Sequence, residues 1–302
     1  MLSREFSMIE PEDALKWETL RPDPQTFDFH QADQLVDFAE RYDMKVRGHT
    51  LVWHRQNPKW LMEGNYTPEQ LSKLLEVHIK TVVGHYKGKI FAWDVANEAF
   101  DEGLRAGEPR QTIWSGAVSH LSTRNSQFAY LAQAFRWAHE ADPHALLFYN
   151  EAEADALNKK SDAVYVMVRD FKRQGVPING VGLQMHIEKP PDMASISANI
   201  ARFTALGIQV HITELDVSLP VDIKGNATPA DLEKQAEIYR QIAQACLSHP
   251  GCTAIQTWGF TDKYSWIGSH SKKARGAALP FDRNYRPKPA HSELIKAFSR
   301  GH

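Results

Sequence analysis

Basic charge is not in excess in this chain of 302 residues. Lys and Arg number 35 against 37 Asp and Glu, which gives a formal net charge of −2 with histidine neutral. Proteins that bind nucleic acid carry a basic stripe or patch, so this balance argues against nucleic acid as a partner. No run approaches the roughly 18 apolar residues that a membrane span needs. The first residues also lack the apolar segment of a secretory signal.

Several short catalytic motifs are absent as well. The chain has 14 His, but it has no HExxH motif or similarly close cluster of metal ligands. His49 and His54 lie five residues apart on one expected strand, and strand alternation points them to opposite faces. No GxSxG motif for a serine nucleophile occurs, and no Gly-rich turn of a dinucleotide fold follows a strand. We therefore predict neither a metal nor a cofactor.

Cysteine is scarce, with only Cys246 and Cys252. Together with His249 they offer too few ligands for a zinc site. Two interpretations remain open from the residues alone. The thiols are two unrelated buried side chains, or they form a disulfide between a helix end and the next strand, which would imply an oxidising compartment.

What the sequence does contain is a repeated pair of elements, a short apolar run followed by a longer amphipathic stretch. The runs predict strands over 6–9, 46–52, 90–95, 145–149, 178–185, 208–215 and 253–260. The stretches predict helices over 32–42, 68–86, 130–141, 162–174, 195–206, 229–247 and 291–298. Such alternation is typical of parallel strands with right-handed crossovers. It favours either a doubly wound sheet or a β/α barrel.

The residues that follow the runs decide between these two folds. Nearly every run ends in polar or aromatic side chains: Glu12, His49, His54, Asn97, Glu98, Asn150, Glu151, Gln184, His186, Glu214, Asp216 and Trp258. Reactive side chains at many strand ends are typical of a barrel, because all its strand ends surround one opening. We predict an α/β fold of the (β/α)8 TIM-barrel type, formed by a single catalytic domain over residues 1–302.

Two of the runs end in carboxylates that are expected to be buried. Glu98 ends one strand, and Glu214 and Asp216 share one face at the end of another, with His211 on the opposite face as a packing residue. A fold keeps a buried carboxylate only when the group is paired or useful. One protonated and one ionised carboxyl group are the minimum for glycoside cleavage. The alternative is a structural pair.

Tryptophan supports the catalytic interpretation. Sugars present flat C–H faces that pack on aromatic rings, while their hydroxyl groups need fixed polar partners. Trp53, Trp60, Trp258 and Trp266 are expected at strand ends or in loops beside polar residues. Trp93 lies in the middle of a strand and is expected in the core. This pattern favours a carbohydrate ligand.

With these residues in view, the chain closely resembles family-10 glycoside hydrolases, whose typical member is an endo-β-1,4-xylanase on a β/α barrel. The resemblance covers about residues 4–298. It rests on these motifs: Lys16-Trp17-Glu18, Gly48-His49-Thr50-Leu51-Val52-Trp53-His54, Trp93-Asp94-Val95-Ala96-Asn97-Glu98, Ile212-Thr213-Glu214-Leu215-Asp216 and Trp258-Gly259-Phe260-Thr261-Asp262-Lys263-Tyr264-Ser265-Trp266.

The resemblance implies roles for particular residues. Glu98 would be the general acid/base and Glu214 the nucleophile, with Asp216 supporting Glu214 through His186. The residues implied to bind substrate are Glu12, Asp13, Lys16, His49, Trp53, Gln56, Asn97, Gln184, His186, Trp258 and Trp266. Cys246 and Cys252 fall where many family members carry a disulfide.

The implied function is retaining endo-hydrolysis of β-1,4-xylosidic bonds, with xylan and xylo-oligosaccharides as ligands and secretion as the location. Two alternatives stay open. One is a β-1,4-glucan hydrolase with the same machinery, and the other is a xylan-binding protein with impaired activity.

Three departures from the family pattern are visible. Asp13 stands where the family usually has Asn, and Asn150-Glu151-Ala152-Glu153 replaces its usual Asn-Asp-aromatic start. The first strand of the family and its helix are missing from this sequence. We therefore expect seven strands, an open edge beside residues 6–9, lower stability than a full-length relative, and an edge that a second copy of the chain could cover.

Overall fold

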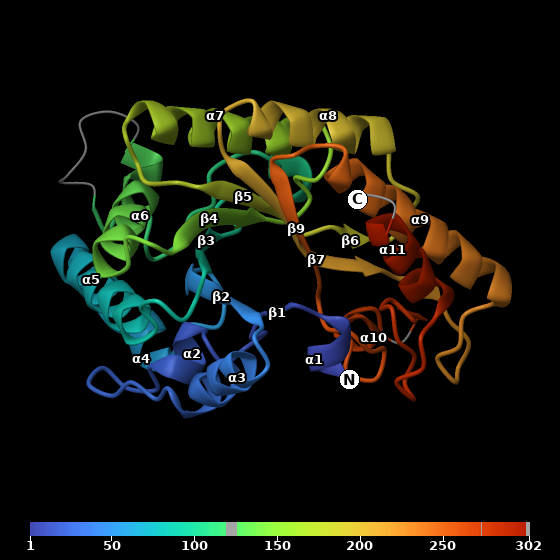
Figure 1. Cartoon of the computed structure of the whole chain (residues 1–302). Helices are drawn as coiled ribbons and strands as arrows, with labels where there is room; N and C mark the ends of the chain where they lie inside the picture. Colours follow the sequence, from blue (N-terminus) through green and yellow to red (C-terminus); the bar gives the residue numbers. More distant parts are fainter. Residues whose placement is uncertain (119–125, 273, 300–302) are drawn as a thin grey trace. The chain divides into compact units, whose positions relative to one another are not determined.

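Parallel strands connected by helices make up most of the structure, a computed structural model that describes residues 1–118, 126–272 and 274–299 (Figure 1). The chain divides into two compact units. The first comprises Met1–Glu151 and Asp162–Val181, and the second comprises Ala152–Ser161 and Gly182–His302.

The sheet of the first unit is parallel and follows chain order. Strands β1 (Met8–Ile9), β2 (Lys45–Val52), β3 (Ala92–Asn97) and β4 (Leu146–Glu151) pair in that sequence. All six residues of β3 are buried, which explains why this strand reads as a continuous run rather than an alternation. The ends of β2, β3 and β4 therefore lie beside one another, and each carries polar residues.

Helices cover this sheet and connect its strands. They are α1 (Leu2–Glu5), α2 (Trp17–Leu20), α3 (His30–Arg41), α4 (Lys59–Met62), α5 (Pro68–His85), η1 (Gly103–Arg105), η3 (Ser126–Phe128) and α6 (Ala129–Ala141). A capping box between Thr67 and Gln70 begins α5 because these side chains satisfy backbone groups that the first turn leaves unpaired. Helix α6 packs against α5 and β3 (Figure 1).

Strand β7 is the centre of the second unit. It spans Gln209–Val217 and pairs in parallel with β9 (Cys252–Thr257) and with the two-residue strand β6 (His186–Ile187). The β6–β7 register places His186 beside Asp216. Strands β8 (Leu219–Pro220) and β10 (Arg275–Gly276) form a separate antiparallel pair.

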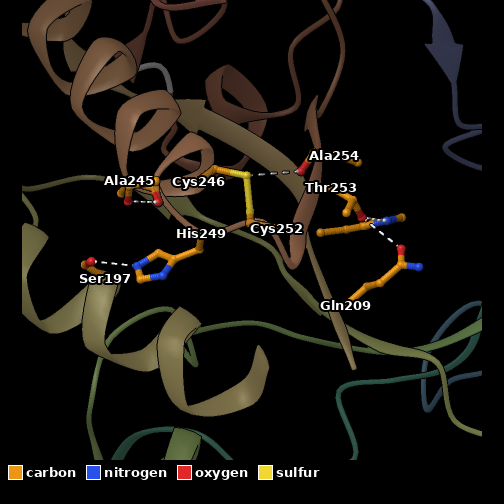
Figure 2. Close-up of a disulfide and its surroundings, with 10 residues drawn as sticks. Ser197, Gln209, Ala245, Cys246, His249, Cys252, Thr253 and Ala254 are labelled. Carbon is orange, nitrogen blue, oxygen red and sulfur yellow. Dashed lines mark hydrogen bonds between the residues drawn. A yellow bond between two sulfur atoms is a disulfide. The ribbon is translucent and has the colours of Figure 1, made fainter. Parts of the chain in front are cut away.

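The helices of the second unit are α8 (Met193–Thr204), α9 (Pro229–Leu247), α10 (Ile267–His270) and α11 (Pro289–Ser299). Helix α9 begins after Thr228, whose hydroxyl accepts the Asp231 N–H, and it packs against α8 and α11. A disulfide joins Cys246, in the last turn of α9, to Cys252 at the start of β9 (Figure 2). The implied disulfide is thus confirmed.

Two elements, one helix and one strand, contribute residues to both units. Helix α7 spans Lys159–Arg173 and strand β5 spans Gly180–Leu183, and the boundary between the units falls inside each of them. Every predicted strand and helix has its counterpart among the described residues, with ends shifted by a few positions. No helix in the described part of the chain combines the length and apolarity of a membrane span.

One tryptophan differs from the sequence prediction. Trp60 lies in the short helix α4 rather than in a loop. Its indole Nε1 donates to the carbonyl of Arg21 at 2.9 Å. Trp60 therefore ties α4 to the segment after α2, which is a structural role.

Candidate active site

Glu98 directly follows β3 and is the expected general acid/base. The indole Nε1 of Trp53 donates to Glu98 Oε2 at 2.9 Å, and the Glu98 side chain is 12% exposed. Trp53 is itself held where β2 ends, because its carbonyl accepts N–H groups of Asn57 at 3.1 Å and Trp114 at 3.3 Å. The carboxyl group of Glu98 is therefore held by a fixed donor yet partly accessible.

His54 also faces Glu98, with 4.0 Å between Nδ1 and Glu98 Oε2. Burial, and then the charge of Arg110, lower the pKa of His54 to about 4. The ring is therefore neutral above that pH. Its Nε2 accepts from Arg55 Nε at 3.1 Å, which puts the ring proton on Nδ1, toward Glu98.

Lys16, Asp13 and Gln56 form a polar group beside Trp53. Asp13 accepts from Gln56 Nε2 at 2.9 Å and from Lys16 Nζ at 3.3 Å, and Lys16 Nζ lies 4.9 Å from the Trp53 ring centroid. Partial burial opposes the charge of Asp13, but these donors lower its pKa below the ordinary value. Asp13 is therefore an anion, and neighbouring Glu12 is exposed.

Asn97 ends β3 and contacts the matching residue of β4. The register of the two strands pairs Asn97 with Asn150, and Asn150 Nδ2 donates to Asn97 Oδ1 at 3.0 Å. Both side chains are buried. The amide of Asn97 is thus oriented by Asn150, with its acceptor oxygen engaged.

His49 lies in a buried cluster of charged groups. Its Nδ1 is 3.0 Å from Asp94 Oδ2 and 3.5 Å from Glu10 Oε1. Arg47 forms ion pairs with Asp94 and, at 3.4 Å, with Glu10. Glu10, His49 and Asp94 have the donor atoms of a metal site within 4.8 Å of one another. The guanidinium of Arg47 already supplies the positive charge there, so these residues do not fit a divalent cation.

In the second unit, His186 bridges the two carboxylates of β7. Its Nε2 is 3.2 Å from Glu214 Oε2 and its Nδ1 is 2.9 Å from Asp216 Oδ2. Burial disfavours the charged ring, but Asp216 and then Glu214 raise the pKa of His186 well above its ordinary value. His186 is therefore an imidazolium that donates to both carboxylates.

Trp266 completes this group. Its Nε1 donates to Asp216 Oδ2 at 2.9 Å, and its ring meets the His186 ring edge-on, with centroids 5.0 Å apart. Gln184 is 2% exposed, and its carbonyl accepts the Glu214 N–H at 3.1 Å. Trp258 follows β9 and is partly exposed. Of the expected set, the second unit thus brings together Glu214, His186, Asp216, Trp266 and Gln184.

His211 lies on the opposite face of β7 from Glu214. It is 1% exposed, and its Nε2 lies 3.0 Å from Thr253 Oγ1 on β9. This contact agrees with its interpretation as a packing residue.

Several residues of the site were not found from the sequence. Glu10 follows the first strand, a position that the strand-end argument could have found. Arg47 and Asp94 are charged residues inside strands that are otherwise largely apolar, and this pattern is only a weak indication of a functional residue. Arg110 lies in an irregular loop and gave none, although its Nε donates to the Glu98 carbonyl at 3.0 Å.

Two solved xylanase structures are similar to this chain. Native xylanase 10B from Thermotoga maritima matches with a TM-score of 0.92 and 42% identity, over 99% of this chain and 88% of that one. Xylanase 10B from Thermotoga petrophila, solved with xylobiose, matches with a TM-score of 0.92 and 42% identity, over 99% and 87%. These matches confirm the predicted fold class, an α/β barrel of the TIM type.

The sequence agrees with the structural comparison. The model of glycosyl hydrolase family 10 matches residues 1–297. Endo-1,4-beta-xylanase B of Thermotoga neapolitana is 43% identical over 289 residues, 95% of this chain and 79% of that protein. Beta-1,4-xylanase of Dictyoglomus thermophilum is 38% identical over 304 residues, 98% of this chain and 83% of that protein. The chain belongs to glycosyl hydrolase family 10.

Proposed function

We propose that this chain is an endo-1,4-β-xylanase that cleaves xylan and xylo-oligosaccharides with retention of configuration. The observation that carries the proposal is the pair of differently held carboxyl groups in a family 10 fold. Glu98 accepts from the Trp53 indole, with the neutral ring of His54 4.0 Å away, whereas Glu214 is held by the imidazolium of His186. Relatives named as xylanases and a xylobiose complex of a similar structure favour xylan as the substrate.

The chemistry assigned to the two groups is a double displacement. Glu98 donates a proton to the leaving glycosidic oxygen while Glu214 attacks the anomeric carbon, and a glycosyl-enzyme ester forms. Water then attacks the anomeric carbon of that ester and gives its proton to Glu98, and the bond to Glu214 breaks to release the Glu214 carboxylate. The imidazolium of His186 stabilises the Glu214 carboxylate before attack and after release.

The substrate assignment is tested by the reducing ends released from xylan and from soluble cellulose. We expect release from xylan well above that from cellulose, and the first product by NMR in the β configuration. Preference for cellulose would support the glucan alternative, and tight xylan binding without release would support the binding-protein alternative.

The roles of the two carboxyl groups are tested by substitution. Glu214→Ala should abolish turnover of every substrate, because no nucleophile remains. Glu98→Ala should spare formation of the glycosyl-enzyme from dinitrophenyl xylobioside, whose leaving group needs no proton. Pre-steady-state release of dinitrophenol measures that step. Equal loss on activated and unactivated substrates would contradict the assignment of Glu98.

We also propose that the protein acts outside the cell. Xylan is too large to enter one, and the Cys246–Cys252 disulfide is of the kind that oxidising compartments maintain. Detection of the chain in the medium of its native cells tests this. Self-association at the edge of β1 stays a prediction, which sedimentation velocity over a range of concentrations would check.

A further inference from the structure

Glu98 has a backbone conformation that a residue other than glycine seldom adopts. Its φ is +54°, in the left-handed region, which disfavours a side chain with a Cβ atom by about 1–2 kcal/mol. Such a conformation persists only where the surrounding structure fixes it. The hydrogen bonds to the backbone of residues 98–100, which directly follow β3, are therefore the contacts that can fix this conformation.

Each backbone polar group of these three residues has a partner. The Glu98 N–H donates to the Asn150 carbonyl at 3.0 Å. Arg110 donates a hydrogen bond to each of the three carbonyl oxygens. Its Nε donates to Glu98 O at 3.0 Å, its backbone N–H to Ala99 O at 2.8 Å, and its Nη2 to Phe100 O at 2.8 Å.

The two remaining N–H groups are bound by side chains of β4. The Ala99 N–H donates to the Tyr149 hydroxyl at 3.0 Å. The Phe100 N–H donates to Glu151 Oε2 at 3.4 Å. Tyr149 and Glu151 are two residues apart on one strand, so they share a face, and both are fully buried.

The hydroxyl of Tyr149 can be oriented in only one way. An N–H group can only donate, so the tyrosine oxygen must accept from Ala99 with a lone pair. The hydroxyl group then donates its own hydrogen bond to Glu151 Oε2. Burial, and then Glu151, raise the pKa of Tyr149 well above its ordinary value, so this proton is retained. The result is a directed chain from Ala99 through Tyr149 to Glu151.

We propose that Tyr149 and Glu151 are positioning residues for the general acid/base, which they orient by holding the turn at residues 98–100. The inference rests on the proposed function, because it needs Glu98 to be the proton donor. The direction of the Glu98 side chain depends on its own backbone angles, and a displacement of about 1 Å in a reacting group can lower a rate about 100-fold. Loss of Tyr149 leaves the Ala99 N–H without this acceptor, and loss of Glu151 leaves the Phe100 N–H without this acceptor.

The experiment compares leaving groups with Tyr149→Phe and Glu151→Met. The substrates are phenyl and 2,4-dinitrophenyl β-xylobioside, and kcat/KM reports the step that forms the glycosyl-enzyme. A displaced proton donor should lower kcat/KM for the phenyl glycoside by about 10-fold or more, within the 10²–10⁴-fold that general acid catalysis supplies. For the dinitrophenyl glycoside the loss should stay below about twofold, because that leaving group needs no proton.

Two further variants separate positioning from stability. Glu151→Gln keeps an acceptor oxygen at the same reach and should recover most of the lost phenyl-glycoside activity. Tyr86→Phe is the matched control. Tyr86 is also a buried tyrosine, and its hydroxyl donates to a carboxylate, that of Asp33 on α3, at 3.0 Å. This variant should change both substrates equally and by little.

Three results would overturn the inference: an equal loss on both glycosides, no loss on either, or a loss of the same pattern in Tyr86→Phe. Failure of the proposed function is recognised separately with Glu98→Ala on the same two substrates. If that variant shows no dependence on the leaving group, Glu98 is not the proton donor, whatever Tyr149→Phe does.

Discussion

His186 lies between two carboxylates, and its charge links the nucleophile to stability. The pKa of His186 is raised well above 6.5 by Asp216 and Glu214 against the opposing effect of burial. A group whose pKa is higher in the folded state stabilises the fold below its unfolded pKa, and this contribution disappears as the pH rises through the folded value. The stabilisation is therefore complete in acid and fades on the alkaline side.

The corresponding prediction concerns His186→Gln. This variant should be less stable than the parent chain near pH 6, and the difference should narrow as the pH increases beyond neutrality, by at most about 1.4 kcal/mol per pH unit for one proton. Urea unfolding at a series of pH values measures it. A difference that stays constant from pH 6 to pH 10 would show that His186 is not charged in the fold.

Asp155 also makes the stability of the fold decrease as the pH rises, as His186 does. Its carboxylate accepts the Met185 N–H at 3.2 Å, beside the turn that presents His186. Desolvation raises the pKa of Asp155 from 3.8 to about 6, although the Met185 N–H and the charge of His186 oppose the shift. The folded state therefore binds this proton more tightly than the unfolded state, and stability is lost as the pH rises from about 4 through about 6.

We predict that Asp155→Asn stabilises the chain at pH 7.5, by up to about 3 kcal/mol at 1.4 kcal/mol per pKa unit, because it removes a charge that burial disfavours. Near pH 4 the gain should vanish, since the parent carboxyl is then protonated. Urea unfolding at both pH values measures the two free energies. The control is Glu233→Gln, an exposed carboxylate on α9, which should show neither effect.

At the scale of elements, the disulfide fixes how α9 leads into β9. Cys246 and Cys252 are six residues apart, so the covalent loop is short (Figure 2). A cross-link stabilises mainly by restricting the unfolded chain, and the effect increases with loop length. The expected contribution is therefore at the lower end of the usual range.

We predict that the double variant Cys246→Ala/Cys252→Ala loses about 2 kcal/mol of unfolding free energy and keeps its turnover of xylan at 25 °C. Guanidinium unfolding and an initial-rate assay provide the two readouts. A reductant should lower the stability of the parent chain by the same amount and leave the double variant unchanged. An effect of reductant on that variant would point to another cause.

At the scale of the whole molecule, two elements cross the boundary between the compact units. Helix α7 and strand β5 each contribute residues to both. Unfolding one unit would therefore break a helix and a strand of the other. We predict a single calorimetric transition in which the calorimetric and van't Hoff enthalpies agree. Two resolved transitions would contradict a single catalytic domain.

Much of this protein follows from the sequence because the signals are local. Alternation of short apolar runs with amphipathic stretches indicates a parallel α/β fold wherever it occurs. Polar residues directly after those runs indicate the functional edge, since strand direction alone brings them together. The motifs around Glu98 and Glu214 are continuous in the chain, so the resemblance to family 10 could be recognised without any contact being known.

The tertiary structure decided which side chains hold the active groups. Trp53 and Glu98 are 45 residues apart, Ala99 and Tyr149 50 apart, and Phe100 and Glu151 51 apart. No local pattern encodes such pairs, because each depends on the register of neighbouring strands and on the path of a loop. Arg110 could not be predicted for the same reason, because it lies in an irregular loop and contacts the Glu98 carbonyl only in the folded chain. The sequence by itself determined the fold class and the two carboxyl groups, and the packing of β2, β3 and β4 determined how one of them is held.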